Sequence, residues 1–260
     1  MFIRSDWIKN TEFHEDSSSE VIQKVMTRVD EVLAKKKLPI VVFDLDSTLF
    51  DVSKRSYEIL REWLAHPETQ SFQATHQGLK GLDAGELKYS LEELWDFKKL
   101  PYQQPPYDHH FKHAKQFWRV RFFGHAYLKH DEPTRGAIEF VKNLYEKGAS
   151  IVYLTGRDAP LMAFGTFDQL KQHGLPIEMD RTRLILKPKR HLNDVDYKSG
   201  VAKMVREWGE VVASFENEPK NLVAMSEAFA PETMNVFIET VSSDHPAPRG
   251  KSIYRIREFK

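Results

Sequence analysis

The chain has 260 residues and no cysteine, and its 38 lysine and arginine residues balance its 38 aspartate and glutamate residues. The absence of cysteine excludes disulfides, thiolate zinc sites and cysteine nucleophiles, and the charge balance disfavours nucleic acid as a partner. Residues 1–6 are not of secretory type, and no segment approaches the ~20 apolar residues that span a bilayer, so we expect a cytoplasmic protein with no membrane partner.

The first predicted element is an amphipathic helix over residues 18–37. Val21, Val25, Val29 and Leu33 recur at helical spacing behind a serine cluster that can cap the helix. We interpret this apolar face as a packing surface.

A short apolar run, residues 40–43, ends at two carboxylates, Asp44 and Asp46. Its β-branched residues predict a strand covered on both faces, and such strands in parallel sheets carry functional groups at their carboxyl ends. Two like charges this close are stable together if a cation lies between them or if one of them holds a proton. A divalent metal with oxygen ligands is the expected cation.

Residues 53–130 contain no strand-like run and predict a helical insertion. Residues 59–64 mark one helix, a capping box of Ser90 and Glu93 begins a second, and residues 111–127 predict a third. The third is rich in aromatic side chains. They could line a substrate pocket, but a small helical domain needs large residues for its own core, and we interpret most of them as core.

From residue 134 onward the chain alternates between predicted helices and strands. The helices cover residues 134–147, 161–170, 199–208 and 221–229, and the strands cover 150–154, 183–186, 211–215 and 235–238. Repeated βαβ units predict an α/β fold with a parallel sheet and helices on both of its faces. Residues 253–259 are expected to return to the edge or flank of this sheet.

Three further features follow the later strands, at the sheet edge that should also carry Asp44. Thr155 and Gly156 come after one strand, where a hydroxyl and backbone N–H groups can contact a phosphate. Lys198 opens a later helix, where its ammonium could reach an anion. Glu216 follows a third strand and offers another oxygen ligand for a metal. Together these features predict an anion site built around a carboxylate nucleophile.

This ordered set of motifs resembles the four motifs of the haloacid dehalogenase superfamily. The motifs are Asp-Leu-Asp-Ser-Thr from Asp44, Leu-Thr-Gly-Arg ending at Arg157, Lys198 and Glu216, and the resemblance covers about residues 38–52 and 133–240. It implies a three-layer core with a Rossmann-like parallel sheet, residues 1–52 and 131–260. The insertion, residues 53–130, would be a mainly helical cap of the C1 type.

The resemblance also implies an activity, that of a Mg²⁺-dependent phosphatase. Asp44 would form an aspartyl phosphate, while Asp46 would protonate the leaving oxygen and later take a proton from the attacking water. Mg²⁺ would be held by the Asp44 carboxylate, the Asp46 backbone carbonyl and Glu216. Thr155, Gly156 and Lys198 would bind the phosphoryl group. The expected partner is a small phosphorylated metabolite, and the oligomeric state is left open.

Several assignments keep an alternative. Lys187 competes with Lys198 for the phosphate, and Asn217 competes with Glu216 for the metal. Thr48 either takes part in the site or caps the turn after the strand. Arg157 either contacts substrate or braces the acidic cluster, and we favour the second.

The function has alternatives as well. Asp46 argues against dehalogenation, because a halide leaving group needs no proton. A phosphotransferase or phosphomutase would use the same aspartyl phosphate with another acceptor. A non-catalytic binding protein is favoured by one departure from the family pattern, since Glu216 stands where the fourth motif normally has aspartate.

Overall fold

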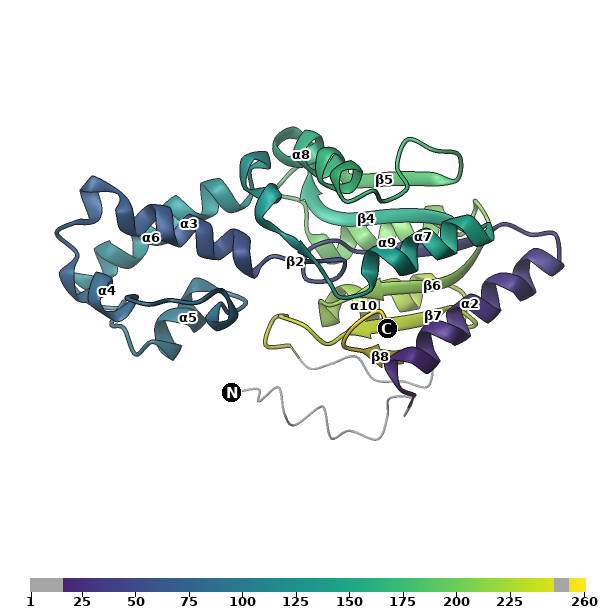
Figure 1. Cartoon of the computed structure of the whole chain (residues 1–260), viewed down its shortest axis with the longest axis horizontal. Helices are drawn as coiled ribbons and strands as arrows, with labels where there is room; N and C mark the ends of the chain where they lie inside the picture. The colour runs from purple at the N-terminus through teal and green to yellow at the C-terminus, as the bar shows by residue number, and fades with distance from the viewer. Residues whose placement is uncertain (1–15, 246–252) are drawn as a thin grey trace.

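The structure is a computed structural model that describes residues 16–245 and 253–260. The expectation for residues 1–6, and the parts of the predicted core at 1–15 and 246–252, lie outside the described residues. Figure 1 shows a sheet flanked by helices and, to one side of it, a separate group of helices that belongs to the insertion.

The sheet has six strands in the order β5-β4-β1-β6-β7-β8, and every neighbouring pair is parallel. The strands are β1 (Pro39–Phe43), β4 (Ser150–Asp158), β5 (Thr182–Lys187), β6 (Glu210–Glu216), β7 (Met234–Ile238) and β8 (Ile253–Ile256). The predicted parallel α/β fold is confirmed. The tail adds the edge strand β8 beside β7, which the sequence left open between edge and flank.

Helices cover both faces of the sheet, as the βαβ pattern predicts. The strand β1 is buried throughout, with Val41 and Phe43 on one face and Ile40 and Val42 on the other. The first face packs against α2 (Ser18–Ala34), α7 (Ala137–Lys147) and α8 (Ala159–Gln172), and the second against α9 (Asp194–Val205) and α10 (Pro219–Ala228). This double burial explains the continuous apolar run in β1.

Two boundaries next to the strand ends differ from those predicted. The strand β4 continues to Asp158, so Thr155 and Gly156 lie in its extended end and the turn into α8 comes after them. The helix α9 begins five residues earlier than predicted, because Asn193 caps it by accepting from the N–H groups of the first turn. Lys198 is therefore one turn inside the helix instead of at its start.

The predicted apolar face of α8 is wrong in part. Leu161 and Phe164 are 47% and 72% exposed, while the polar residues Thr166 and Gln169 are buried. The reason is a buried arginine, Arg157, which donates hydrogen bonds to Thr166 and Gln169 on this face of the helix. The need to satisfy the buried Arg157 guanidinium thus outweighs the hydrophobic pattern of the helix.

The insertion folds around a core of its own. Leu60, Trp63, Leu94, Trp95 and Phe111 are buried together there, so the core interpretation of its large residues holds for these. Its helices are α3 (Ser53–Ala65), α4 (Gln73–Gly78), α5 (Leu91–Phe97) and α6 (Tyr107–Phe122), with 3₁₀ turns at Pro67–Thr69, Ala84–Glu86 and His125–His130.

A small antiparallel pair ties together the two ends of the insertion. The strands β2 (Phe50–Asp51) and β3 (Glu132–Pro133) pair directly before and after it. This pair was not predicted, because two-residue strands have no periodicity to detect. It brings the start of α3 and the end of the insertion close to the loop that follows β1.

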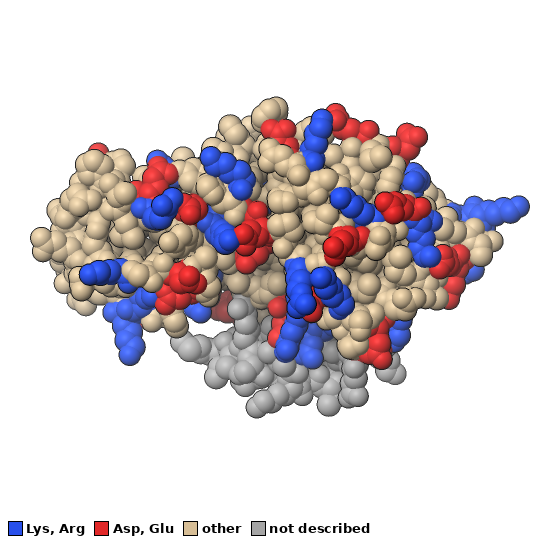
Figure 2. All heavy atoms as spheres, in the orientation of Figure 1, with Lys and Arg blue, Asp and Glu red and all other residues tan. Residues whose placement is uncertain are grey.

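On the face shown in Figure 2, acidic and basic side chains of the described residues are interspersed. In the described part of the chain, no helix has the length and apolar character needed to cross a membrane.

Candidate active site

The residues singled out from the sequence line one cavity of about 370 Å³ at the carboxyl edge of the sheet. These lining residues are Asp44, Asp46, Thr155, Gly156, Lys198 and Glu216. They come from the ends of β1, β4 and β6 and from the first turns of α9. Parallel strands bring their carboxyl ends to one edge, and for this reason residues far apart in sequence meet here.

A tight loop after β1 places the first two carboxylates. The N–H of Asp44 donates to the Phe215 carbonyl at 3.0 Å, which continues the β1–β6 pairing to the carboxyl edge of the sheet. Ser47 then adopts a left-handed conformation with φ of 58°, and its N–H donates to the Phe50 carbonyl at 2.7 Å. The loop turns back at once, so Asp44 and Asp46 both reach the cavity.

Thr48 and Asn217 fasten this loop to the end of β6. The buried Thr48 hydroxyl donates to Asn217 Oδ1 at 3.2 Å and accepts from the Asn217 N–H at 3.1 Å. The Asn217 amide also donates to the Val241 carbonyl at 2.6 Å. These bonds favour the capping alternative for Thr48, and they occupy the Asn217 side chain, which favours Glu216 over Asn217 as a metal ligand.

Lys198 lies between the nucleophile candidate and the acidic residue of β6. Its ammonium donates to Asp44 Oδ1 and to Glu216 Oε2, both at 2.6 Å, and all three side chains are buried. Lys187 instead contacts Asp194 and the carbonyls of its own loop. The geometry therefore favours Lys198 over Lys187.

Burial dominates the electrostatics of this first cluster. It raises the pKa of Asp44, and Lys198 offsets the effect only in part. Burial and the neighbouring Asp44 raise the pKa of Glu216 to about 8. The two carboxylates in turn raise the pKa of Lys198 against the effect of burial. With both carboxylates ionised, one negative charge is in excess over the single ammonium, and the raised pKa values of the two carboxyl groups reflect this excess.

Asp46 has a different environment, created by two arginines. Its Oδ1 accepts from Arg55 Nη2 at 2.6 Å and from Arg157 Nη2 at 2.6 Å. Both guanidinium groups also pair with the buried Asp131. Burial raises the pKa of Asp46, but Arg157 and Arg55 outweigh it and hold this pKa well below its usual range.

The Arg157 environment supports the bracing role favoured from the sequence. Besides Asp46 and Asp131, it donates to Thr166 at 3.2 Å and to Gln169 at 2.7 Å, both on α8. Arg55 and Asp131 were missed altogether. Arg55 lies on the buried face of α3, ahead of the residues 59–64 from which that helix was predicted, and Asp131 lies in an unremarkable polar stretch, so neither carries a local signal.

Thr155 and Gly156, in the end of β4, form another part of the cavity lining. The Thr155 hydroxyl accepts from the Arg157 N–H at 3.2 Å, which leaves its proton for another acceptor. At Gly156 a Cβ would lie 2.9 Å from Asp194 Oδ2, so a larger residue would press on the first turn of α9. The backbone can approach an anion closely at this position.

The insertion supplies a wall of its own to the cavity. Tyr89, Trp118, Phe122 and Phe123 line it, together with Lys88. Trp118 is fixed by a hydrogen bond from Nε1 to the Ser56 hydroxyl at 3.0 Å. Phe122 and Phe123 therefore correct the broader core interpretation, because they line the cavity, whereas Trp118 lines the cavity and also packs against the insertion core.

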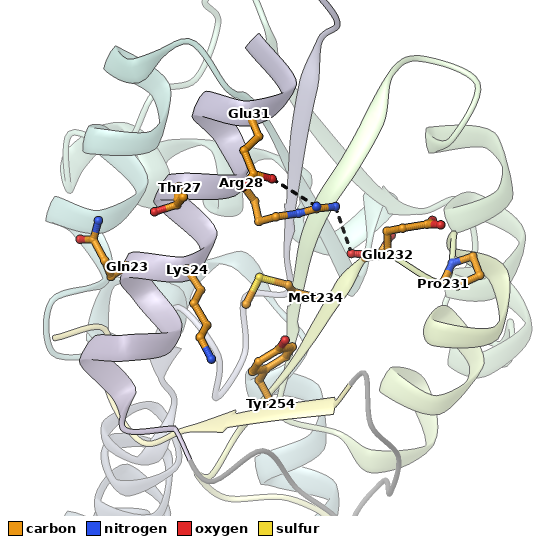
Figure 3. A pocket seen from close by; sticks show the side chains of 10 residues that line it. Gln23, Lys24, Thr27, Arg28, Glu31, Pro231, Glu232, Met234 and Tyr254 are labelled. Atoms are coloured by element: carbon orange, nitrogen blue, oxygen red, sulfur yellow. Dashed lines mark hydrogen bonds and ion pairs between the residues drawn. The ribbon is translucent and has the colours of Figure 1, made fainter. Parts of the chain in front are cut away.

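A larger cavity, of about 610 Å³, lies between α2 and the amino ends of β7 and β8 (Figure 3). Its basic side chains already have acidic partners. Arg28 pairs with Glu31 at 3.3 Å, and Lys24 pairs with Asp16 at 2.6 Å. This cavity lies at the sheet edge opposite to Asp44, so it takes no part in the chemistry of the candidate site.

The family of the chain follows from a match to a family model. The model for the haloacid dehalogenase superfamily, subfamily IIIB (acid phosphatase), matches residues 99–228, half of the chain. The chain belongs to this family. The match contains Thr155, Gly156, Lys198 and Glu216, whereas Asp44 and Asp46 precede it.

Solved structures with distant similarity include a class C acid phosphatase from Bacillus anthracis. It is 16% identical with a TM-score of 0.43, and the match covers 78% of this chain and 62% of that one. A superfamily hydrolase from Ehrlichia chaffeensis is 12% identical (TM-score 0.46; 85% and 91% covered). A haloacid dehalogenase-like protein from Streptococcus pneumoniae is also 12% identical (TM-score 0.47; 85% and 94% covered). No protein with a curated description matches the chain.

Proposed function

We propose that this protein is a Mg²⁺-dependent phosphatase that hydrolyses a small phosphomonoester through an aspartyl-phosphate intermediate. The observation that carries the proposal is the position of the Asp44 carboxylate. It lies in one cavity with Lys198, Thr155 and Gly156, which suit the oxygens of a phosphoryl group. Membership of an acid phosphatase family supports hydrolysis of a phosphomonoester.

In the first displacement, a carboxylate oxygen of Asp44 attacks phosphorus and the bond to the leaving oxygen breaks. Lys198 and the wall at Thr155 and Gly156 hold the phosphoryl oxygens during this step. Asp46 relays a proton to the leaving oxygen. Because two arginines keep Asp46 ionised, this proton must arrive with the substrate, and a phosphate ester carries one below its second pKa of about 6.

In the second displacement, water attacks the aspartyl phosphate and Asp44 is released as a carboxylate. Asp46 accepts the proton of this water. An ionised Asp46 is already in the form that this step needs. The phosphorus–oxygen bond to Asp44 breaks, and inorganic phosphate leaves.

The residues present fit a bound Mg²⁺. Asp44 and Glu216 leave one negative charge without a counterion beside Lys198, and carboxylate oxygen is the ligand that Mg²⁺ prefers. Within residues 16–245 and 253–260, no group of three acidic or histidine side chains has an arrangement that could hold a metal ion, so the Asp46 backbone carbonyl would complete the set. Mg²⁺ would offset a carboxylate–phosphate repulsion of about 4 kcal/mol per charge pair at ~4 Å and an effective dielectric of ~20.

We also propose that residues 53–130 act as a C1-type cap over the core formed by residues 1–52 and 131–260. Support comes from the separate core of the insertion and from the aromatic wall that it adds to the cavity. A covered site favours a small phosphorylated metabolite over a folded protein. The cytoplasmic location stays a prediction from composition.

The test is phosphate release from 4-nitrophenyl phosphate and from a panel of metabolite phosphomonoesters, with Mg²⁺ or with EDTA. We expect release with Mg²⁺ and none with EDTA. Absence of Mg²⁺-dependent release from every compound would favour the non-catalytic alternative. Transfer of phosphate to an added alcohol in preference to water would favour a phosphotransferase.

A further inference from the structure

The side chain of Arg55 connects the insertion to the catalytic loop. It lies on α3, three residues into the insertion, and it is completely buried. Its guanidinium donates to Asp46 Oδ1 at 2.6 Å and, through Nε, to Asp131 Oδ1 at 2.7 Å. Arg55 therefore reaches the proton-transfer residue from outside the core.

The same guanidinium also contacts the wall of the cavity. Its Nη1 donates to the Phe122 carbonyl at 3.2 Å, and the group lies 4.5 Å from the centre of the Phe122 ring. Phe122 ends α6 and lines the cavity. One side chain thus touches both a substrate-facing residue of the insertion and Asp46.

The bonds to Asp46 leave one carboxylate oxygen for chemistry. Among the described residues, the side-chain bonds from Arg55 and Arg157 all converge on Oδ1. Oδ2 has no such partner there, and the Asp46 side chain is 31% exposed towards the cavity. Anchoring one oxygen with two planar guanidinium groups fixes the direction of the other.

We propose that Arg55 is a positioning residue for Asp46, which it holds as the proton acceptor for the second displacement. In that step water adds to phosphorus, its proton passes to Asp46 Oδ2, and the bond from phosphorus to Asp44 breaks. Arg157 anchors Asp46 from the core, and Arg55 anchors it from the insertion. This inference rests on the proposed phosphatase function.

The experiment measures two rate constants in the Arg55→Met variant, those for formation and for hydrolysis of the phosphoenzyme. Rapid-quench kinetics with 4-nitrophenyl phosphate and Mg²⁺ give both. Nitrophenol needs little help from an acid to leave, so formation of the phosphoenzyme should change less than about threefold. Hydrolysis of the phosphoenzyme should slow by about 10- to 100-fold, because Asp46 is misplaced. A merely structural role would lower both rate constants together.

Two further variants control the result. Arg61→Met removes an exposed arginine of the same helix and should leave both rate constants unchanged. Arg55→Lys keeps the charge but lacks the fork that reaches Asp46 and Asp131 together, so it should recover only part of the hydrolysis rate. If Arg55→Met does not fold, Arg55→Met/Asp131→Asn removes both charges and should show the same split.

The outcomes are distinct. An active native protein whose variants lose both rate constants equally, or lose neither, would overturn the role of Arg55 alone. A native protein that forms no phosphoenzyme and releases no nitrophenol would overturn the proposed function, and this inference with it.

Discussion

Two clusters of buried charge meet at the same cavity, and they differ in charge balance. In the first, Asp44 and Glu216 share one ammonium, that of Lys198. In the second, Asp46 and Asp131 face two guanidinium groups, those of Arg55 and Arg157. With both of its carboxylates ionised, the first cluster has one negative charge in excess, and for this reason the pKa of Glu216 is raised, whereas the second cluster is neutral.

This difference in charge balance suits the two clusters to different tasks, although both are built from carboxylates and basic side chains. Excess negative charge in a buried site raises carboxylate pKa values and attracts a cation, so the first cluster suits metal binding. A neutral and fully hydrogen-bonded network has no need of a ligand and fixes the geometry of its members. The second cluster therefore suits orientation of Asp46 and attachment of the insertion.

The largest expected effect tests the first cluster at the nucleophile. Asp44→Asn should lower kcat/KM for 4-nitrophenyl phosphate by about 10⁴-fold or more, because the amide cannot form the aspartyl phosphate. Asp158→Asn is the matched control. It changes another buried carboxylate, at the N-cap of α8, to a residue that also caps well. Equal activity of the two variants would exclude Asp44 as the nucleophile.

The next largest effect distinguishes the two lysines near the site, because their substitution should lower kcat/KM by different factors. Lys198→Met should lower kcat/KM by about 100-fold or more, because an oriented positive charge on the phosphoryl oxygens is lost. Lys187→Met should lower it less than about tenfold, since Lys187 pairs with Asp194 and with its own loop. Steady-state kinetics with saturating Mg²⁺ measure both. The reverse order would assign the phosphate to Lys187.

Removing one acidic residue from the neutral second cluster should destabilise the fold. Asp131→Asn leaves a buried guanidinium charge without its partner and should lower the free energy of unfolding by about 3 kcal/mol. Glu58→Gln breaks the exposed pair with Arg61 and should lower it by less than about 1 kcal/mol. Urea unfolding of both variants provides the comparison. Similar losses would mean that the buried cluster contributes no more than a surface pair.

The last prediction is a gradual pH dependence of the metal-free protein. The pKa of Glu216 is about 8 in the folded chain and 4.5 ordinarily, so between these values the folded state holds a proton that the unfolded state has released. The free energy of unfolding should therefore fall as pH rises from about 5 to 8, by roughly 1 kcal/mol per pH unit at most.

Two controls accompany this pH profile. Glu216→Gln should flatten it, because the titrating group is gone. Saturating Mg²⁺ should flatten it as well, because a cation favours the ionised carboxylates. A profile in EDTA that rises over this range would contradict the excess negative charge of the first cluster.

Local sequence patterns were enough to find the site residues at the strand ends. Asp44 follows an apolar run, Glu216 ends another, and Thr155 and Gly156 follow a third, so strand ends alone mark these positions. Parallel strands align their carboxyl ends, so the sequence could predict that these residues meet. Helix ends were less certain, as α9 shows, because a cap such as Asn193 moves the boundary by several residues.

The second cluster could not be predicted in this way. Arg55 and Asp131 are 76 positions apart, and the contact depends on how the two ends of the insertion return to the core. The β2–β3 pair that sets this return is too short to leave a pattern. The exposed Phe164 and the buried Gln169 of α8 show the same limit, because Arg157 decides which face turns inward.

The sequence by itself therefore determined the parallel α/β core, the helical insertion and the acidic residues at the strand ends. Hydrophobic periodicity and strand direction are local properties, and they suffice for these conclusions. The tertiary structure alone decided which cation each carboxylate faces. Pairing between buried charges depends on distances of a few ångströms between distant segments, and no local pattern in the chain encodes such distances.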